Sequence, residues 1–258
     1  MTRTREHAAL APILERARVP RDGILVVHSA IALLSRQGFR AEAIIEALLD
    51  YMQDGTLVMP TMTWRTVTLE RPHWGELETP SHTGVLTEIF RTRFARARSI
   101  HPTHSAAAYG PQAERLLARH HIDDTPVSAN SPYGLMHREL THVLMIGVGL
   151  ESCTAIHLPE EQRAPDIYLR PAGQTELYQC RDRHGVVHDV RTRRHWRLDR
   201  DFPKFGPPLE RQGVMISGNI GDCRYAVVPL ADLLDAVFAA LAVDPRGTLR
   251  DQSSGAVH

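Results

Sequence analysis

Two apolar segments separated by an amphipathic helix pattern constrain the fold of this chain more than any other feature. The segments are DGILVVHSA at 22–30 and DGTLVMPT at 54–61, and each has a glycine just before its apolar run. Their short, uninterrupted apolar runs predict buried strands. Between them, RAEAIIEALLDYMQ at 40–53 places its apolar residues at helical spacing. Strand, helix and strand joined by short connections predict a right-handed parallel crossover.

The remainder of the chain extends this pattern and then changes it. THVLMIGVG at 141–149 predicts a third buried strand, whereas 175–196 and 214–230 read as antiparallel hairpins and 230–243 as a closing helix. We therefore expect an α/β fold with a largely parallel central sheet, flanking helices and an antiparallel β excursion in the C-terminal third. Residues 1–244 are expected to form a single domain, and the polar segment 245–258 to form a disordered tail.

Composition excludes several classes of function. The 258 residues are 43% hydrophobic and 23% charged, which is typical of a globular protein with a core. The formal net charge is zero, which gives no support to nucleic-acid binding. No apolar run reaches the roughly 18 residues of a membrane span, and the N-terminal segment lacks the apolar stretch of a signal peptide. These features predict a cytoplasmic protein without a membrane partner.

The cysteines and the glycine-rich patterns identify no standard site. Cys153, Cys180 and Cys223 are an odd number, are widely spaced and form no CxxC pair, so we expect free thiols and no zinc finger. The dinucleotide pattern GxGxxG, the phosphate-binding Walker loop and the GxSxG nucleophile elbow are all absent. Nucleotide-binding and α/β-hydrolase chemistry therefore have no specific support.

The segment CTAIHLPEEQ, at 153–162, is the first candidate site because it directly follows the third predicted strand. Ligand sites of parallel sheets lie beyond the carboxyl ends of the strands. His157 is followed one helical turn later by Glu160 and Glu161, and either carboxylate could orient the imidazole as a base. The same spacing also fits a surface histidine at a helix start, with the glutamates favouring the helix dipole. Spacing alone leaves both interpretations open.

Two further segments carry polar groups at predicted loop or strand ends. RSIHPTHS, at 98–105, gathers hydroxyls and imidazoles that could hold a phosphate, ligate a metal or cap backbone groups. His28 and Ser29 end the first strand, where backbone amides could bind an anion. Cys153 could act as a nucleophile near His157, although a buried thiol is the more common outcome.

Seven segments, taken in order, resemble one family: the antibiotic N-acetyltransferases, typified by the aminoglycoside 3-N-acetyltransferases. The resemblance extends over nearly the whole chain. The matching segments are 25–34, 55–61, 79–91, 98–110, 131–136, 143–161 and 217–237.

This resemblance implies an acyltransferase that uses acetyl-CoA as cosubstrate and a small-molecule primary amine as acceptor, with no metal. The HxxE motif of the family corresponds to His157 and Glu160, which implies that His157 is the general base and that Glu160 orients it or holds the acceptor. The amine would then attack the thioester directly. The residues that the resemblance implies for CoA binding are His28, Ser29, Ala30, Ser99, His101, Thr103 and Ser105.

The acceptor is less defined. Candidate acceptor-binding carboxylates are Glu78, Glu161 and Asp199. Aminoglycoside-modifying members of the family usually have Asp-Pro before the TPS motif, whereas this chain has HWGELETPS, with Gly75 near the expected aspartate and Glu76 or Glu78 as substitutes. Residues 163–211 hold eleven Arg or Lys against seven Asp or Glu. Because a polycation requires an acidic site, this balance favours a neutral or acidic amine as acceptor.

Other functions stay open at this point. The scaffold could use another acyl thioester or a non-aminoglycoside acceptor, or it could bind a ligand without catalysis. A metal-dependent hydrolase using His101, His104 and His157 is a further alternative. Enzymes of this size are commonly dimers, so a homodimer is the oligomer to expect.

Overall fold

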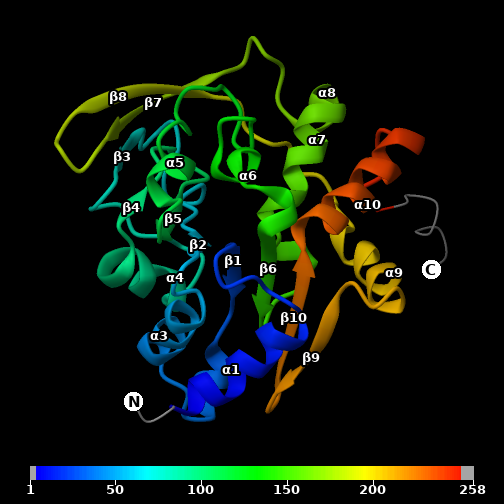
Figure 1. Ribbon diagram of the computed structural model, residues 1–258. Helices are drawn as coiled ribbons and strands as arrows, with labels where there is room; N and C mark the ends of the chain where they lie inside the picture. The colour runs from blue at the N-terminus through cyan, green and yellow to red at the C-terminus, as the bar shows by residue number, and fades with distance from the viewer. Residues whose placement is uncertain (1–3, 251–258) are drawn as a thin grey trace.

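The computed structural model describes residues 4–250 and is built around a seven-stranded sheet, with the strand order β4-β5-β2-β1-β6-β10-β9 (Figure 1). The first predicted crossover is present, since β1 pairs in parallel with β2. The strands of this sheet are β1 (Ile24–Ser29), β2 (Thr56–Pro60), β4 (Ala97–Arg98), β5 (Ala106–Tyr109), β6 (Thr141–Ile146), β9 (Ile216–Ile220) and β10 (Cys223–Pro229).

Parallel pairing defines the centre of the sheet. β1 is parallel to both of its neighbours, β2 and β6. β5 is antiparallel to β2 and β4, and β10 is antiparallel to β6 and β9. The prediction of an α/β fold with a largely parallel central sheet is therefore confirmed. The predicted hairpin at 214–230 forms β9 and β10, which complete one side of this sheet.

Helices cover both faces of the sheet. The α-helices are α1 (Arg5–Arg16), α2 (Ala32–Arg36), α3 (Ala41–Tyr51), α4 (Val85–Ile89), α5 (Ala113–Leu117), α6 (Pro132–Leu135), α7 (His157–Arg163), α8 (Pro165–Tyr168), α9 (Gly206–Arg211) and α10 (Leu230–Val243). The π-helical segment is η1 (Phe90–Phe94), and the 3-10 helices are η2 (Arg138–Leu140), η3 (Leu150–Ser152), η4 (Thr154–Ile156) and η5 (Phe202–Phe205).

The side chains of β1 point alternately to the two faces of the sheet, and each face has its own hydrophobic core. Leu25 and Val27 pack with residues of α1, α3 and α4. Ile24 and Val26 pack on the opposite face with residues of α5, α7 and α10. Successive side chains of a strand point to opposite faces, so an uninterrupted apolar run requires helices on both sides. The central strands are therefore held rigidly, and their carboxyl ends are fixed relative to one another.

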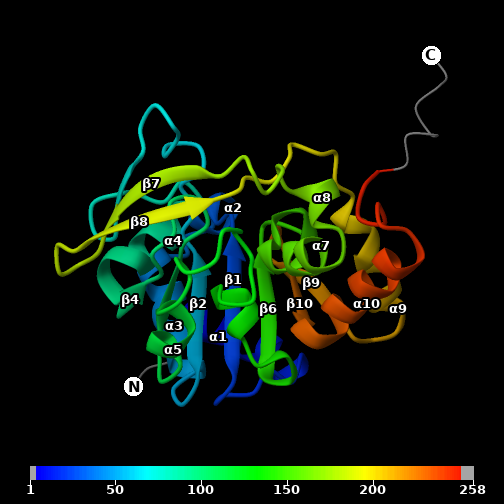
Figure 2. The same cartoon turned by 90° about the horizontal axis from the view of Figure 1, so that it is seen from above.

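A second, three-stranded sheet contains β3 (His73–Gly75), β7 (Glu176–Arg181) and β8 (Val187–Thr192). β7 and β8 form the hairpin predicted at 175–196. In Figure 2 this hairpin lies across the end of the main sheet where β1 leads into α2. A small core of its own supports it, with Trp74, Tyr178 and Val190 buried together. The predicted β excursion is therefore confirmed, and it covers the end of the sheet where a site was expected.

The C-terminal segment differs in part from the prediction of a disordered tail. Thr248 and Leu249 are buried, and Leu249 forms an antiparallel bridge with Arg200. Residues 245–250 are thus part of the packed structure, because Thr248 and Leu249 find partners far away in the sequence. Residues 251–258 of the predicted tail lie outside the described residues. Within 4–250, no helix combines the length and the apolarity that crossing a bilayer requires.

Candidate active site

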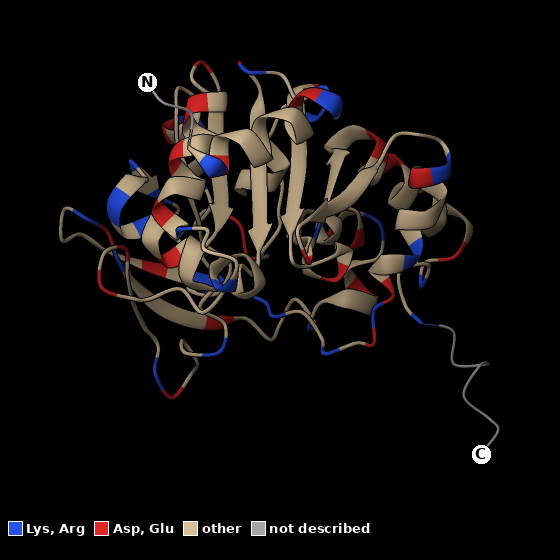
Figure 3. Ribbon diagram, turned by 90° about the horizontal axis from the view of Figure 1, so that it is seen from below, with Lys and Arg blue, Asp and Glu red and all other residues tan. Residues whose placement is uncertain are grey.

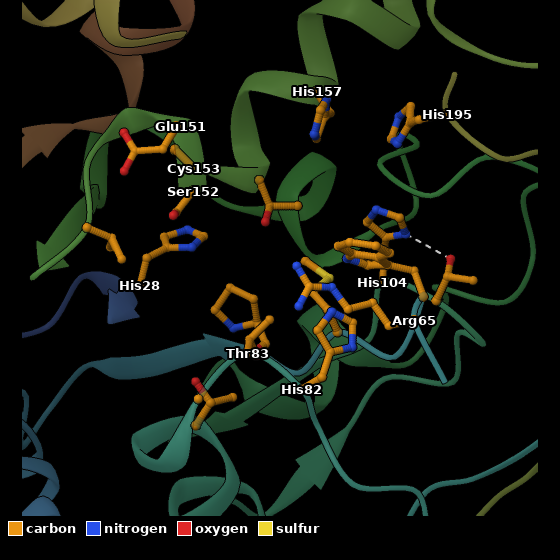
Figure 4. A pocket seen from close by; sticks show the side chains of 18 of the residues that line it. His28, Arg65, His82, Thr83, His104, Glu151, Ser152, Cys153, His157 and His195 are labelled. Atoms are coloured by element: carbon orange, nitrogen blue, oxygen red, sulfur yellow. Dashed lines mark hydrogen bonds between the residues drawn. The ribbon is translucent and has the colours of Figure 1, made fainter. Parts of the chain in front are cut away.

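A pocket of about 700 Å³ opens at the carboxyl ends of β2, β1 and β6. Its lining combines His28 and Ser29 from β1, Pro60 from β2, and the segment after β6 that leads into α7. The loop between β8 and η5 closes another side. This is the position at which parallel sheets bind ligands. Figure 4 shows the imidazole of His157 pointing into the pocket from the start of α7.

His157 and Glu160 form a hydrogen-bonded pair on the first turn of α7. The His157 Nδ1 to Glu160 Oε2 distance is 2.7 Å, and the two residues are three positions apart, so the helix itself brings them together. The Glu160 side chain is fully buried, whereas 18% of the His157 side chain is exposed. The buried partner is therefore a fixed support, and the histidine is the member of the pair that meets the pocket.

Distant segments compensate the buried charge of Glu160. Arg200 Nε donates to both carboxylate oxygens at 3.1 Å, and the Thr248 hydroxyl donates to Oε1 at 2.6 Å. Burial alone would raise the pKa of Glu160, but His157, Arg200 and Thr248 together lower this pKa to about 2. Glu160 is thus ionised at neutral pH, and only Nδ1 of His157 can donate to it. Nε2 is left with a free lone pair, as a general base requires.

A second histidine–glutamate pair lies against the first. The ring of His195 stacks on that of His157 with 4.4 Å between centroids, and His195 Nε2 lies 2.8 Å from Glu161 Oε1. The same oxygen accepts the backbone N–H of Val127 at 2.9 Å. Burial raises the pKa of Glu161 to about 7, and burial with the neighbouring His157 lowers the pKa of His195 well below its usual range. The sequence left Glu160 and Glu161 as alternatives for His157; the structure pairs His157 with Glu160 and His195 with Glu161.

The residues predicted at the end of β1 line the pocket. His28, Ser29 and Ala30 all face it. Neither His28 Nε2 nor Ser29 Oγ has a hydrogen-bond partner in the protein. Burial lowers the pKa of His28 to about 4, so its ring is neutral at physiological pH. Both side chains therefore carry a buried polar atom that no protein group satisfies.

Only part of the 98–105 loop reaches the pocket. Thr103, one of the residues predicted to bind CoA, lines the pocket. Ser99, His101 and Ser105 are fully buried and absent from the lining, so they are not available for the predicted direct contact with CoA. Internal hydrogen bonds engage all three of them. Ser99 Oγ lies 2.8 Å from His120 Nδ1, and Ser105 Oγ donates to the Thr61 carbonyl at 2.8 Å.

His101 has an internal structural role in the same loop. Its Nδ1 accepts the backbone N–H groups of Thr103 at 3.2 Å and of His104 at 3.0 Å. That nitrogen is therefore unavailable to a metal. In the part of the chain that the structure describes, no group of three or more His, Cys, Asp or Glu side chains is arranged to hold a metal ion.

The predicted acceptor-binding carboxylates do not line the pocket. Glu78 and Asp199 are exposed outside it, and Asp199 lies 3.6 Å from Arg250. Glu161 is buried behind His195. Glu76, the other substitute for the missing aspartate, is buried in an ion pair with Arg183. Charge and sequence position made these residues candidates, but their side chains are engaged elsewhere or face solvent.

Cys153 lines the pocket but is a poor nucleophile. Its side chain is 1% exposed, and burial raises the pKa of its thiol to about 12. The reactive form of cysteine is the thiolate, which is scarce at neutral pH for such a group. Among the described residues, all three cysteines are free and buried.

Sequence reasoning missed three residues that shape this site. Arg200 and Thr248 bind Glu160 from 40 and 88 positions away, and His195 stacks on His157 from the loop after β8. None of them belongs to a motif or to a periodic pattern. His195 had one usable signal, since it stands in a run of basic residues at the end of a predicted hairpin.

Comparisons with known proteins agree with this architecture. The family model described as aminoglycoside 3-N-acetyltransferase matches residues 26–242. The chain is also similar to the SPbeta prophage-derived aminoglycoside N(3')-acetyltransferase-like protein YokD of Bacillus subtilis (strain 168). The two are 24% identical over 239 residues, which cover 82% of this chain and 83% of that protein.

Solved structures of aminoglycoside acetyltransferases share the fold. A mutant form of AAC(3)-IVa in complex with gentamicin has a TM-score of 0.78 and 25% identity, covering 96% of this chain and 93% of that one. AAC-IIIb in binary complex with CoASH has a TM-score of 0.76 and 22% identity, covering 92% of this chain and 96% of that one. At this level of identity the second likeness concerns the fold.

Proposed function

The chain belongs to the aminoglycoside 3-N-acetyltransferase family, and from this membership we propose that it transfers an acetyl group from acetyl-CoA to a primary amine of a small molecule. The pocket at the carboxyl ends of the central strands is the proposed reaction site. The observation that carries the proposal is the His157–Glu160 pair, whose Nδ1 to Oε2 distance is 2.7 Å at the edge of that pocket.

His157 is the proposed general base. The amine nitrogen attacks the thioester carbonyl carbon, and Nε2 of His157 takes the proton that the nitrogen loses. The tetrahedral intermediate then collapses, the carbon–sulfur bond breaks, and the proton passes from the imidazolium to the CoA thiolate. Glu160 supports each step, because its buried carboxylate stabilises the imidazolium and fixes the ring orientation. The thioester is already activated, so no covalent enzyme intermediate is needed.

The oxyanion of the intermediate needs a hydrogen-bond donor. The backbone amides of Thr103 and His104 are poor candidates, because both already donate to His101 Nδ1. Ser29 lines the pocket, and its buried hydroxyl has no partner in the protein, which makes it our candidate donor.

We place the acetyl-CoA thioester beside His28, Ser29 and Ala30, with Thr103 across the pocket. These residues line the pocket, and two of them carry polar atoms without protein partners. The CoASH complex of AAC-IIIb, which has the same fold, agrees with a CoA site in this scaffold. A cytoplasmic location, where acetyl-CoA is present, remains part of the proposal.

Replacement of His157 by Ala tests this function. With acetyl-CoA and a panel of primary amines, release of free thiol by the wild-type protein should exceed that of His157→Ala by about 10²–10⁴-fold. CoA binding measured by calorimetry should be retained in the variant. His184→Ala is the matched control, since His184 is exposed in the turn between β7 and β8. A wild-type protein that binds no CoA, or a His157→Ala variant with full activity, would favour a non-catalytic ligand-binding role.

A further inference from the structure

The charge that lines the pocket is predominantly positive. Among the described residues, the lining contains the four arginines Arg65, Arg194, Arg197 and Arg200, but only one carboxylate, Glu151. The whole molecule has no such bias, because its formal net charge is zero and acidic and basic residues are interspersed over the elements in Figure 3. The positive charge is therefore a local property of this pocket.

Two of these guanidinium groups are already compensated and two are not. Arg194 pairs with Glu176 at 2.6 Å, and Arg200 pairs with Glu160 at 3.1 Å. Within residues 4–250, neither Arg65 nor Arg197 forms a salt bridge with a carboxylate. Arg200 additionally has a buried Nη2 without a protein partner. The pocket thus has two guanidinium groups, those of Arg65 and Arg197, that no carboxylate of the described residues pairs with.

Two aromatic side chains surround Arg65 on its side of the pocket. The guanidinium of Arg65 lies 4.8 Å from the centroid of the Trp64 ring, and His82 packs edge-on against the same ring at 4.8 Å. Burial and the charge of Arg65 lower the pKa of His82 to about 4, so His82 adds no charge of its own at neutral pH. Figure 4 shows Arg65 beside His82 and His104, away from Glu151.

The carboxylates that could neutralise the charge of Arg65 and Arg197 either bind other side chains or lie outside the pocket. Glu76 is buried against Arg183, and Glu78 is exposed outside the pocket. Glu160 and Glu161 are each hydrogen-bonded to a histidine. A polycationic acceptor would consequently meet like charges, which weakens its binding.

We propose that the acceptor of this enzyme is an amine that carries an acidic group, either a carboxylate or a phosphate, and that Arg65 and Arg197 bind that group while the amine lies at His157. This substrate class rests on the proposed acetyl transfer. Arginine suits the task, because its planar guanidinium forms paired hydrogen bonds with both carboxylate and phosphate oxygens.

The test measures amine binding to the CoA-saturated protein by calorimetry, with glucosamine 6-phosphate, glucosamine and kanamycin as probes. Saturation with CoA occupies any site that its own phosphates use. We expect the phosphate-bearing amine to bind at least about tenfold more tightly than glucosamine, and kanamycin to bind most weakly. Arg65→Gln should remove most of the preference for the phosphate-bearing amine. Arg211→Gln, which changes an exposed arginine outside the pocket, should retain it.

The outcomes separate this proposal from the proposed function. Failure of glucosamine 6-phosphate to bind, a preference for kanamycin, or an Arg65→Gln variant with unchanged preference overturns the acidic acceptor. A loss in Arg65→Gln confined to the affinity for CoA also overturns it, because that guanidinium then binds a CoA phosphate. Failure of the wild-type protein to bind CoA at all overturns the proposed acetyl transfer itself.

Discussion

At the scale of single residues, Glu160 determines how the site works. A buried carboxylate is stable only when other groups compensate its charge. Here Arg200 supplies the opposite charge, His157 donates from Nδ1, and Thr248 supplies a hydroxyl donor. Because the pKa of Glu160 is lowered to about 2, the carboxylate keeps its charge over the whole neutral range, and Nδ1 of His157 remains the donor.

Replacement of Glu160 by Gln should therefore lower kcat about 10- to 100-fold, with little change in KM for acetyl-CoA. The amide retains the size of the side chain but cannot stabilise the imidazolium that forms during the reaction. Steady-state thiol release measures the effect, and a thermal melt verifies that the variant is folded. Glu78→Gln, which alters an exposed glutamate outside the pocket, is the matched control. A Glu160→Gln variant as active as this control would contradict the role of the pair.

At the scale of elements, the close packing of the end of β6 against the end of β1 shapes the floor of the candidate site. Gly147 follows β6 directly and has a φ of +68°, in the left-handed region that L side chains rarely adopt. A Cβ at this position would lie 2.3 Å from the carbonyl oxygen of Ala30, a residue that lines the pocket. The close approach of these two backbones therefore requires glycine.

Gly147→Ala should lower the free energy of unfolding by about 1–3 kcal/mol, through an unfavourable φ and a displaced Ala30. Urea unfolding measures this change. Gly173→Ala provides the comparison, since no atom lies within 4 Å of a Cβ at position 173 and its φ lies outside the left-handed region. If the two variants had the same free energy of unfolding, the backbone of Ala30 could move away from β6 without loss of stability, which would contradict this prediction.

At the scale of the whole molecule, buried histidines make stability depend on pH. Burial is the largest cause that lowers the pKa of each of them, and it leaves them neutral in the folded protein. The group comprises the buried His28, His101 and His120 and the half-buried His104 and His195. In the unfolded chain such groups take up protons as the pH falls below about 6.5. Their contribution to stability is complete above that pH and is lost as the pH falls towards the folded pKa.

His120 allows this dependence to be measured outside the pocket. Its Nε2 donates to the Pro126 carbonyl at 2.9 Å, and burial lowers its pKa to about 4. The free energy of unfolding should fall by about 2 kcal/mol more in the wild type than in His120→Gln between pH 8 and pH 5, because the variant lacks the titrating ring. Urea titrations at the two pH values give this difference. If the free energy of unfolding depended on pH in the same way in both proteins, His120 would make no contribution to this pH dependence.

The assembly and domain organisation of the molecule remain predictions. We retain the proposal that residues 1–244 form one domain, and a single cooperative transition in the same urea titrations would support it. A homodimer likewise stays a prediction.

The sequence by itself determined the parts of this protein that depend on local spacing. The apolar runs of β1, β2 and β6 predicted buried parallel strands, and the three-residue separation of His157 and Glu160 predicted two side chains on one helical face. These features depend on neighbours in the chain, so periodicity and turn chemistry are sufficient to identify them.

Only the tertiary structure decided how distant segments complete the site. Thr248 and Arg200 reach Glu160 from other parts of the fold, His195 stacks on His157, and the polar groups of Ser99 and Ser105 are engaged internally. Burial and hydrogen-bond partners depend on packing between segments far apart in sequence, and local pattern does not encode them. For the same reason, Glu78 and Asp199 were predicted from the sequence to bind the acceptor, whereas in the fold four arginines line the pocket and these two carboxylates do not.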